Sequence, residues 1–460
     1  MFLKRRSFLE KYNKILYLPI ETYSREFHSK LYLAYQACQR GWAVVIGPEY
    51  DVNKLAQYLP SGVFFGIGFH RKFAKISKVL KKSEHLIISQ DEEGLDRWAP
   101  ELYKEYRIYP EINDLLEYFL CWGEEDKAII ESAFKKKIQA KPVGNLRLDL
   151  LNSDLRKIFL GNVSDLKNNY GDFVLINGKF GTVNHTNGLD YYLNELKLRG
   201  WMNSSFKKNF QLQRVEFHKI IFEKMIELSI ALAKSGQKVV VRPHPSENIE
   251  VWMNKTKNYS KNIKIVRSGN IIPWLMASKL VIHNGCTTAI EGLLLEKTII
   301  SYRPFKNPNI ETDLPNKISI CLESKEEVVN YVKNYEVDES KVNIKNSLKI
   351  LDNFIKINKS KEDASFRILN IIDNLSNRKE TNKVKIVKDN ILIEIAIIKS
   401  MINKIIYKKN FIYIKSKCPK LDKDEANKIL NLFLDIKNGY YKVKASNLSR
   451  YSLMISRKFD

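Results

Sequence analysis

The chain has 460 residues, of which 44% are hydrophobic and 11% aromatic, a composition typical of packed globular domains that excludes an intrinsically disordered protein. A chain of this length exceeds what one hydrophobic core usually supports, so we expect several domains. The formal net charge of +25 would attract nucleic acid, anionic lipid or acidic glycans. Nucleic-acid binding is the least favoured, because no RRM, KH or helix-turn-helix pattern accompanies the charge.

Five scattered cysteines contain no CxxC pair, which argues against a disulfide framework and a zinc site and predicts a reducing compartment. The basic residues 4–6 are not followed by the apolar segment of a signal peptide. No run of about 18 apolar residues occurs that could cross a bilayer. We therefore expect a cytoplasmic protein.

The first part of the chain alternates apolar strands with helical patterns. A helix is expected from about residue 26 to residue 40, where Gly41 suits its C-terminal cap. This alternation predicts βαβ units and a parallel sheet. The expected strands are 15–19, 43–46, 63–65, 86–88, 118–122 and 142–143.

A second series begins after residues 151–170, a polar stretch that we interpret as a linker. A helix is expected at about 215–235, and the alternation again predicts a doubly wound sheet. The expected strands are 173–176, 238–241, 263–266, 279–282 and 298–301. The chain then becomes helical from about residue 324.

The last part, after residue 376, begins with a polar run at 377–383 that we interpret as a hinge. Residues 384–411 alternate Ile clusters with Lys at helical spacing, as in a basic amphipathic helix on anionic lipid. A helix packed on the body with a solvated lysine face is the alternative. The predicted domains are 1–155 and 156–376, both Rossmann-like, followed by a helical basic tail at 377–460.

Two short stretches, 239–247 and 280–292, carry the strongest functional signal. In each, an apolar run stops at a His within a polar turn, where the strands of an α/β sheet present ligand sites. Donors and positive charge there would suit a phosphate, and we expect it to belong to a nucleotide. The alternative is that Thr287 caps a helix and the histidines are core residues. The nucleotide-binding candidates are Arg242, His244, Pro245, His283, Asn284, Thr287, Thr288 and Glu291.

A second set of candidates is acidic. Asp91, Glu92 and Glu93 follow an expected buried strand, so we expect them at its carboxyl end, where neighbouring acids raise one another's pKa and suit a proton acceptor. A solvated acidic turn is the alternative. Glu21, Arg25 and Glu26 follow the first strand and are candidates on the acceptor side and for catalysis, although Glu26 could simply complement a helix dipole.

The loop after the first strand of the second domain, residues 177–181, contains two glycines that permit close approach to a ligand. Asn177 and Lys179 of this loop join the nucleotide-binding candidates. Asp422 and Asp424 form the Asp-x-Asp spacing that a metal would need, but they fall in the tail. We therefore expect no metal and no cofactor other than a nucleotide-sugar co-substrate.

The order of these motifs resembles bacterial surface carbohydrate biosynthesis proteins, GT-B glycosyltransferases related to Kdo and sialic-acid-type transferases. The resemblance spans about residues 15–305 and leaves out the tail. The stretches that carry it are 18–21, 25–27, 45–48, 91–94, 119–123, 143–149, 242–245 and 287–291.

The resemblance implies two Rossmann-like domains facing a cleft, with the acceptor on the N-terminal side and the nucleotide sugar on the C-terminal domain. It implies that Glu92 or Glu93, before Gly94, supplies the catalytic carboxylate and that His244-Pro245 contacts the CMP phosphate. Thr287 and Thr288 would complete the phosphate contacts.

The function we expect is transfer of a sugar, an ulosonic acid such as Kdo or a sialic-acid relative, from a CMP-activated donor to a glycan or lipid-linked acceptor. The expected location is the cytoplasm, with the basic tail offering peripheral attachment to the inner face of the membrane. A CDP-glycerol polymerase, a UDP-GlcNAc 2-epimerase and a non-catalytic scaffold are the alternatives. The sequence alone leaves open the sugar, the linkage, the stereochemical outcome and the oligomeric state.

Overall fold

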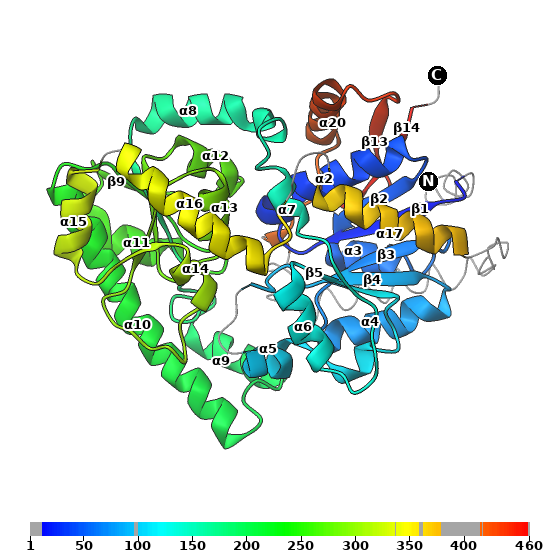
Figure 1. Cartoon of the computed structure of the whole chain (residues 1–460), viewed down its shortest axis with the longest axis horizontal. Helices are drawn as coiled ribbons and strands as arrows, with labels where there is room; N and C mark the ends of the chain where they lie inside the picture. The colour runs from blue at the N-terminus through cyan, green and yellow to red at the C-terminus, as the bar shows by residue number, and fades with distance from the viewer. Residues whose placement is uncertain are drawn as a thin grey trace. The chain divides into compact units, whose positions relative to one another are not determined.

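A computed structural model describes residues 12–95, 100–335, 337–357, 362–378, 415 and 417–458. The chain divides into two compact units (Figure 1). Unit 1 contains residues 1–94, 107–158 and 355–460, and unit 2 contains residues 95–106 and 159–354. Among the described residues, no helix is long and apolar enough to cross a membrane.

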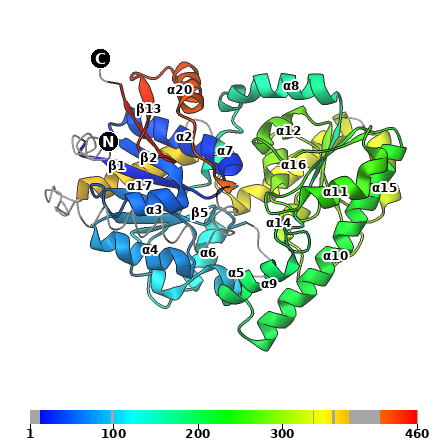
Figure 2. The ribbon, with the colours of Figure 1, turned by 180° about the vertical axis from the view of Figure 1, so that it is seen from behind.

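Unit 1 is built on an eight-stranded sheet with the order β13-β14-β2-β1-β3-β4-β5-β6. The six strands from the first part of the chain are parallel, and apolar residues fill them because helices cover the sheet. Figure 2 shows α2 and α3 against this sheet. The strands are β1 (Ile15–Ile20), β2 (Ala43–Pro48), β3 (Val63–Ile67), β4 (Leu86–Gln90), β5 (Tyr118–Cys121), β6 (Ala140–Pro142), β13 (Val443–Asn447) and β14 (Leu453–Arg457).

The helices of unit 1 largely follow the expected alternation. The expected helix at 26–40 is present but begins three residues earlier, at Tyr23. The helices are α2 (Tyr23–Gln39), α3 (Glu49–Leu55), α4 (Arg71–Lys82), α6 (Glu124–Ser132), α7 (Leu146–Asp149), α17 (Ala364–Arg378) and α20 (Lys423–Lys437), with the 3-10 turns η1 (Pro110–Ile112) and η2 (Leu155–Phe159).

Unit 2 has a six-stranded parallel sheet with the order β12-β11-β10-β7-β8-β9. Its core joins the β-branched strand residues to the long helix α10, which carries buried Phe217, Ile221 and Met225. The strands are β7 (Val174–Asn177), β8 (Val239–Arg242), β9 (Ile263–Ile265), β10 (Leu280–His283), β11 (Ile299–Tyr302) and β12 (Ile320–Leu322).

The helices of unit 2 are α5 (Pro100–Arg107), whose last residue belongs to unit 1, α8 (Leu160–Tyr170), α9 (Leu189–Leu198), α10 (Ser205–Lys234), α11 (Ile249–Thr256), α12 (Ile271–Ala277), α13 (Thr288–Leu294), α14 (Asp313–Lys317), α15 (Lys325–Lys333) and α16 (Val337–Phe354), with η3 (Lys257–Tyr259). The chain passes from unit 1 to unit 2 between residues 158 and 159, within the stretch 151–170 that was interpreted as a linker. The helix α8, which occupies 160–170 and packs against α12, was not predicted.

The two parallel α/β sheets confirm the predicted Rossmann-like character of both halves. The described part of the tail is only partly helical. Its hairpin β13–β14 adds to the edge of the unit 1 sheet, where β14 runs antiparallel to β2. Residues 379–414, which include nearly all of the predicted hinge and the amphipathic stretch at 384–411, lie outside the described residues.

Candidate functional site

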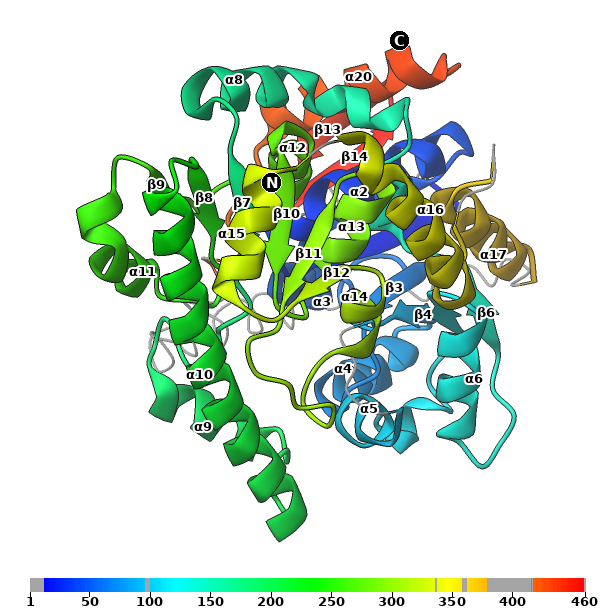
Figure 3. The same ribbon diagram turned by 60° about the vertical axis from the view of Figure 1, so that its left-hand side comes forward.

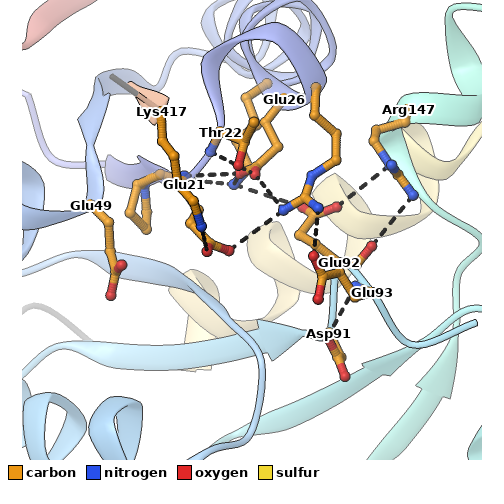
Figure 4. Close-up of polar contacts among 12 residues, drawn as sticks. Glu21, Thr22, Glu26, Glu49, Asp91, Glu92, Glu93, Arg147 and Lys417 are labelled. Carbon is orange, nitrogen blue, oxygen red and sulfur yellow. Dashed lines mark hydrogen bonds and ion pairs between the residues drawn. The ribbon is translucent and has the colours of Figure 1, made fainter. Parts of the chain in front are cut away.

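The carboxyl edge of the unit 1 sheet gathers the acidic candidates. The strand order reverses between β1 and β3, and such a switch point is where open α/β sheets place ligands. Glu21 follows β1 and residues 91–93 follow β4, so the two predicted groups meet there (Figure 4). Glu49, which follows β2, is drawn beside them.

Glu26 is fully buried at the start of α2. Its carboxylate accepts hydrogen bonds from the backbone N–H of Glu21 at 3.2 Å and of Thr22 at 3.0 Å, and it pairs with Lys30 at 2.8 Å. Burial alone would raise its pKa, but Lys30 and Arg25 hold that pKa at about 2. Glu26 therefore organises the turn after β1, and its buried carboxylate does not face solvent.

Glu93 lies between two arginines. Its carboxylate accepts from Arg25 at 2.9 Å and from Arg107 at 2.8 Å. Although burial acts to raise the pKa of Glu93, the two guanidinium groups hold it well below its usual value. The prediction that neighbouring acids raise its pKa is wrong, because each acid of the cluster is neutralised by cations from other elements.

Glu92 points into the body of unit 1 and its side chain is only 5% exposed. It accepts a hydrogen bond from Asn145 at 3.3 Å and lies 3.7 Å from the Lys30 ammonium and 3.9 Å from Arg147. Asp91 accepts from the backbone N–H of Glu93 at 3.0 Å and thereby shapes the turn. Asp91 thus acts within the turn, whereas Glu92 joins the turn to α2 and to the start of α7.

Gly94 closes this acidic turn for a steric reason. A Cβ at this position would lie 3.0 Å from the indole nitrogen of Trp122, which itself donates to the Asp91 carbonyl at 2.8 Å. Trp122 follows β5, so the acidic turn is fastened to the neighbouring strand end. The packing of the turn against Trp122 therefore requires a glycine after Glu92 and Glu93, whether or not these acids take part in a reaction.

Glu21 and Glu93 are the acids of this network that solvent reaches most readily, each with a side chain 38% exposed. Glu21 is held more loosely than Glu93, with Arg25 at 3.5 Å and Lys417 at 3.4 Å. Burial acts to raise the pKa of Glu21, whereas Lys417 and Arg25 lower it, and the net direction is downward. These two carboxylates are the ones that a substrate could touch.

Sequence reasoning missed the cations that neutralise this edge. Lys30 offered a signal, since it stands one helical turn after Glu26 within an apolar stretch. Arg107 and Lys417 offered none, because they lie 14 and 396 residues from the acids they meet.

His70 was also missed. It is the N-cap of α4, and its Nδ1 accepts from the backbone N–H of Phe73 at 3.1 Å. Burial lowers the pKa of His70, so the neutral form is favoured, with its proton on Nε2. It stands after β3, on the other side of the switch point from Glu21, where a neutral imidazole can donate one hydrogen bond.

The carboxyl edge of the unit 2 sheet has the opposite character. Its strand order reverses between β10 and β7. At that point Asn177 donates to the Thr288 hydroxyl at 2.9 Å, and the Lys179 ammonium donates to the Gly285 carbonyl at 3.1 Å. Gly285 has a φ of +62°, and a Cβ there would meet the Thr312 hydroxyl at 2.4 Å. Two predicted stretches are thus brought together by contacts between residues that are 106 and 111 positions apart.

His283 ends β10 and is fully buried. One ring nitrogen lies 2.9 Å from the Ser319 hydroxyl, and Nδ1 accepts from the Cys286 backbone at 3.2 Å. Burial, reinforced by Lys179, lowers its pKa to about 3. Asn284 donates to the Tyr302 carbonyl at 2.8 Å. Both side chains therefore hold the turn before α13, in agreement with the alternative that His283 is a core histidine.

His244 and Pro245 lie in the turn after β8 and are partly exposed. The His244 ring contacts the Ser246 hydroxyl at 2.7 Å. The turn is organised by Glu247, which is fully buried and accepts from the backbone of His244 at 2.8 Å and of Phe180 at 3.0 Å. Glu247 is the last residue of the predicted stretch 239–247, and its role was not predicted.

Glu247 also accepts from the Trp252 indole at 2.8 Å. Burial raises its pKa, although hydrogen bonds from Trp252, Phe180, His244 and Asn184 oppose that change. Through this one carboxylate the 177–181 loop and the His244 turn become a single structure.

Arg242 is directed away from this turn. Its guanidinium donates to the carbonyls of Ser268 at 2.7 Å and Gly269 at 2.9 Å and lies 4.9 Å from the Trp274 ring. Burial lowers its pKa to about 10. Both terminal nitrogens hold the 268–269 loop, and the phosphate contact of Arg242 stays a prediction.

Thr287 occupies the N-cap position of α13, but its side chain makes no capping hydrogen bond. Glu291, in the same helix, is 5% exposed. Their predicted nucleotide contacts stay predictions. Within the described ranges, no group of three or more His, Cys, Asp or Glu side chains is arranged to hold a metal ion, and the five cysteines are free.

No family model matches the sequence, and no curated protein matches it either. Many solved structures are similar to this chain, and three of them follow. Anabaena Alr3699/HepE in complex with UDP and glucose has a TM-score of 0.43 and 11% identity, over 79% of this chain and 99% of that one. Wall teichoic acid polymerase TagF has 0.47 and 12%, over 83% and 95%. Methanocaldococcus jannaschii UDP-GlcNAc 2-epimerase has 0.44 and 14%, over 78% and 99%. At such low identity, none of these assigns a role to a residue of this chain.

Proposed function

We propose that the chain is a glycosyltransferase that binds a nucleotide-activated sugar at the carboxyl edge of unit 2. The observation that carries the proposal is the convergence of Asn177, Lys179 and Thr288 at the β10/β7 switch point. An ammonium group, an amide and a hydroxyl from two loops at one edge of the sheet are donors that suit a phosphate. His244 stands at the end of the neighbouring strand β8.

The carboxyl edge of unit 1 supports the acceptor role. Sugar transfer requires a group that accepts the proton or hydrogen bond of the acceptor hydroxyl. Of the two acids that the sequence favoured, Glu93 has a side chain 38% exposed and Glu92 only 5%. Glu93 is therefore the one an acceptor could reach, and its low pKa keeps it ionised as a hydrogen-bond acceptor.

The donor we propose is CMP-activated and carries an ulosonic acid such as Kdo or a sialic-acid relative, and the acceptor is a glycan or lipid-linked glycan. This choice rests on the resemblance of the sequence around His244-Pro245 and around Glu92-Glu93-Gly94 to such transferases. A CDP-glycerol polymerase, a UDP-GlcNAc 2-epimerase and a non-catalytic scaffold stay alternatives.

The test is a thermal-shift series of the full chain with CMP, CDP, UMP and UDP. A nucleotide at about 100 times its Kd should stabilise the protein by roughly 2.7 kcal/mol. We expect stabilisation by CMP that is weakened in Lys179→Ala and His244→Ala. Lys255→Ala is the matched control, since Lys255 pairs with Glu223 on the surface of unit 2.

Selectivity for CDP would favour the polymerase, and selectivity for UDP the epimerase, which an acceptor-free assay with UDP-GlcNAc would then detect. If no nucleotide stabilises the wild type, the proposal is wrong and the scaffold becomes the leading alternative. If Lys179→Ala binds as tightly as the wild type, the site has been placed at the wrong edge.

A further inference from the structure

The turn between α9 and α10 exposes two large apolar side chains. Leu198, the last residue of α9, is 82% exposed, and Phe206, at the start of α10, is 65% exposed. Figure 3 shows this end of α10 extending well beyond the sheet of unit 2. Single exposed apolar residues are ordinary, but here two of this size flank one turn within nine residues, and we call these two side chains the apolar patch.

The patch continues the buried face of α10. Phe206 stands one helical turn before Phe210, which is 7% exposed and belongs to the core of unit 2. The apolar stripe of α10 that packs against the core of unit 2 therefore continues beyond the part of the helix that the core covers. At Phe206 it meets solvent.

The turn is also held in place. Ser204 caps α10 by accepting from the backbone N–H of Lys207 at 3.2 Å. Trp201 packs against Tyr106 with ring centroids 5.1 Å apart. Gly200 has a φ of +76°, which suits glycine at the end of α9. Because these contacts fix the backbone, an ordered turn holds Leu198 and Phe206 at the surface.

Positive charge surrounds the patch. Lys197, Arg199 and Lys208 are exposed beside the two apolar residues. Two acids lie near: Glu195 is 3.8 Å from Arg199, and Glu105 pairs with Lys207 at 2.9 Å. Cations therefore outnumber acids around the turn, which is the composition of an interfacial membrane contact.

We propose that the turn of residues 197–208 docks on an anionic lipid surface, with Leu198 and Phe206 entering the interface and Lys197 and Lys208 facing the headgroups. A second copy of the chain fits less well, since a symmetric contact would bring the same cations together. This docking site is separate from the basic tail and does not rest on the proposed sugar transfer.

The experiment is flotation of the full chain with phosphatidylglycerol–phosphatidylcholine vesicles and with pure phosphatidylcholine vesicles. We expect binding to the anionic vesicles and a roughly tenfold or greater loss of partitioning in the Leu198→Ser, Phe206→Ser double variant. Leu160→Ser, at a position 54% exposed on α8, is the matched control and should bind like the wild type.

A Lys197→Gln, Lys208→Gln variant should lose affinity for anionic vesicles and leave the melting temperature unchanged. The proposal is overturned if the wild type does not float, or if the apolar double variant floats like the wild type, which would assign binding to the tail. It is also overturned if the wild type is a dimer in light scattering that Phe206→Ser converts to a monomer, since the patch would then be a self-interface.

Discussion

The guanidinium of Arg25 and the carboxylate of Glu93 form a 2.9 Å ion pair between the first turn of α2 and the loop after β4. These residues are 68 positions apart, and β3 lies between their strands in the sheet. The pair therefore spans the switch point of unit 1. It fixes the distance between the two loops that present the exposed carboxylates Glu21 and Glu93.

Glu93→Gln should destabilise the protein by about 1 kcal/mol, because Arg25 and Arg107 lose their shared partner at a site that water partly screens. Urea unfolding measures the change. Glu124→Gln, at a side chain 75% exposed, is the control and should change stability little. A loss of glycan synthesis far larger than this destabilisation explains would assign Glu93 a chemical role. Unchanged synthesis would remove it as the catalytic candidate.

Glu26→Gln should cost more, about 3 kcal/mol, since it leaves Lys30 buried with a weakened partner. It should also change the pH dependence of stability. The folded pKa of Glu26, about 2, lies below its ordinary value of 4.5, so its stabilisation is complete above pH 4.5 and is lost as the pH falls toward 2. The variant should show a shallower loss of melting temperature across this window. An acid limb identical to that of the wild type would contradict the prediction.

Glu247→Gln should loosen the nucleotide edge of unit 2. The amide group replaces one of the two oxygens that serve Phe180, His244 and Trp252, so a buried donor is left facing another donor. We expect a lower melting temperature, by roughly 2 kcal/mol in stability. Nucleotide-induced stabilisation should be weaker as well. A variant with reduced stability but undiminished nucleotide response would show that the turn does not contact the ligand.

Gly47→Ala should displace the C-terminal hairpin from unit 1. A Cβ at Gly47 would lie 2.0 Å from the Ser452 hydroxyl and 2.9 Å from its Cα, so the backbone of the loop before β14 must move. Limited proteolysis should then cleave near residues 442–457 at lower protease concentration than in the wild type. Gly161→Ala in α8 meets nothing within 4 Å and should be neutral or slightly stabilising. Equal protease resistance in all three proteins would contradict the prediction.

Much of the local structure was predictable. The parallel strands of both sheets coincide with runs of β-branched residues that end at polar turns, because buried strands need continuous apolar residues. The placement of Asp91 and Glu21 at strand ends follows from the same rule. The helix at 160–170 was missed because none of its residues is buried, so its sequence carries no apolar stripe.

The sequence by itself determined the two α/β halves and the strand ends that bear polar side chains, since hydrophobic periodicity acts over a few residues. Only the tertiary structure decided which charges neutralise one another. In the folded chain Glu93 pairs with Arg25 and Arg107, and Arg242 donates to the 268–269 loop. Lys417 pairs with Glu21, which lies 396 residues away in the sequence. Charge pairing depends on distances in space, and separation along the chain does not specify those distances.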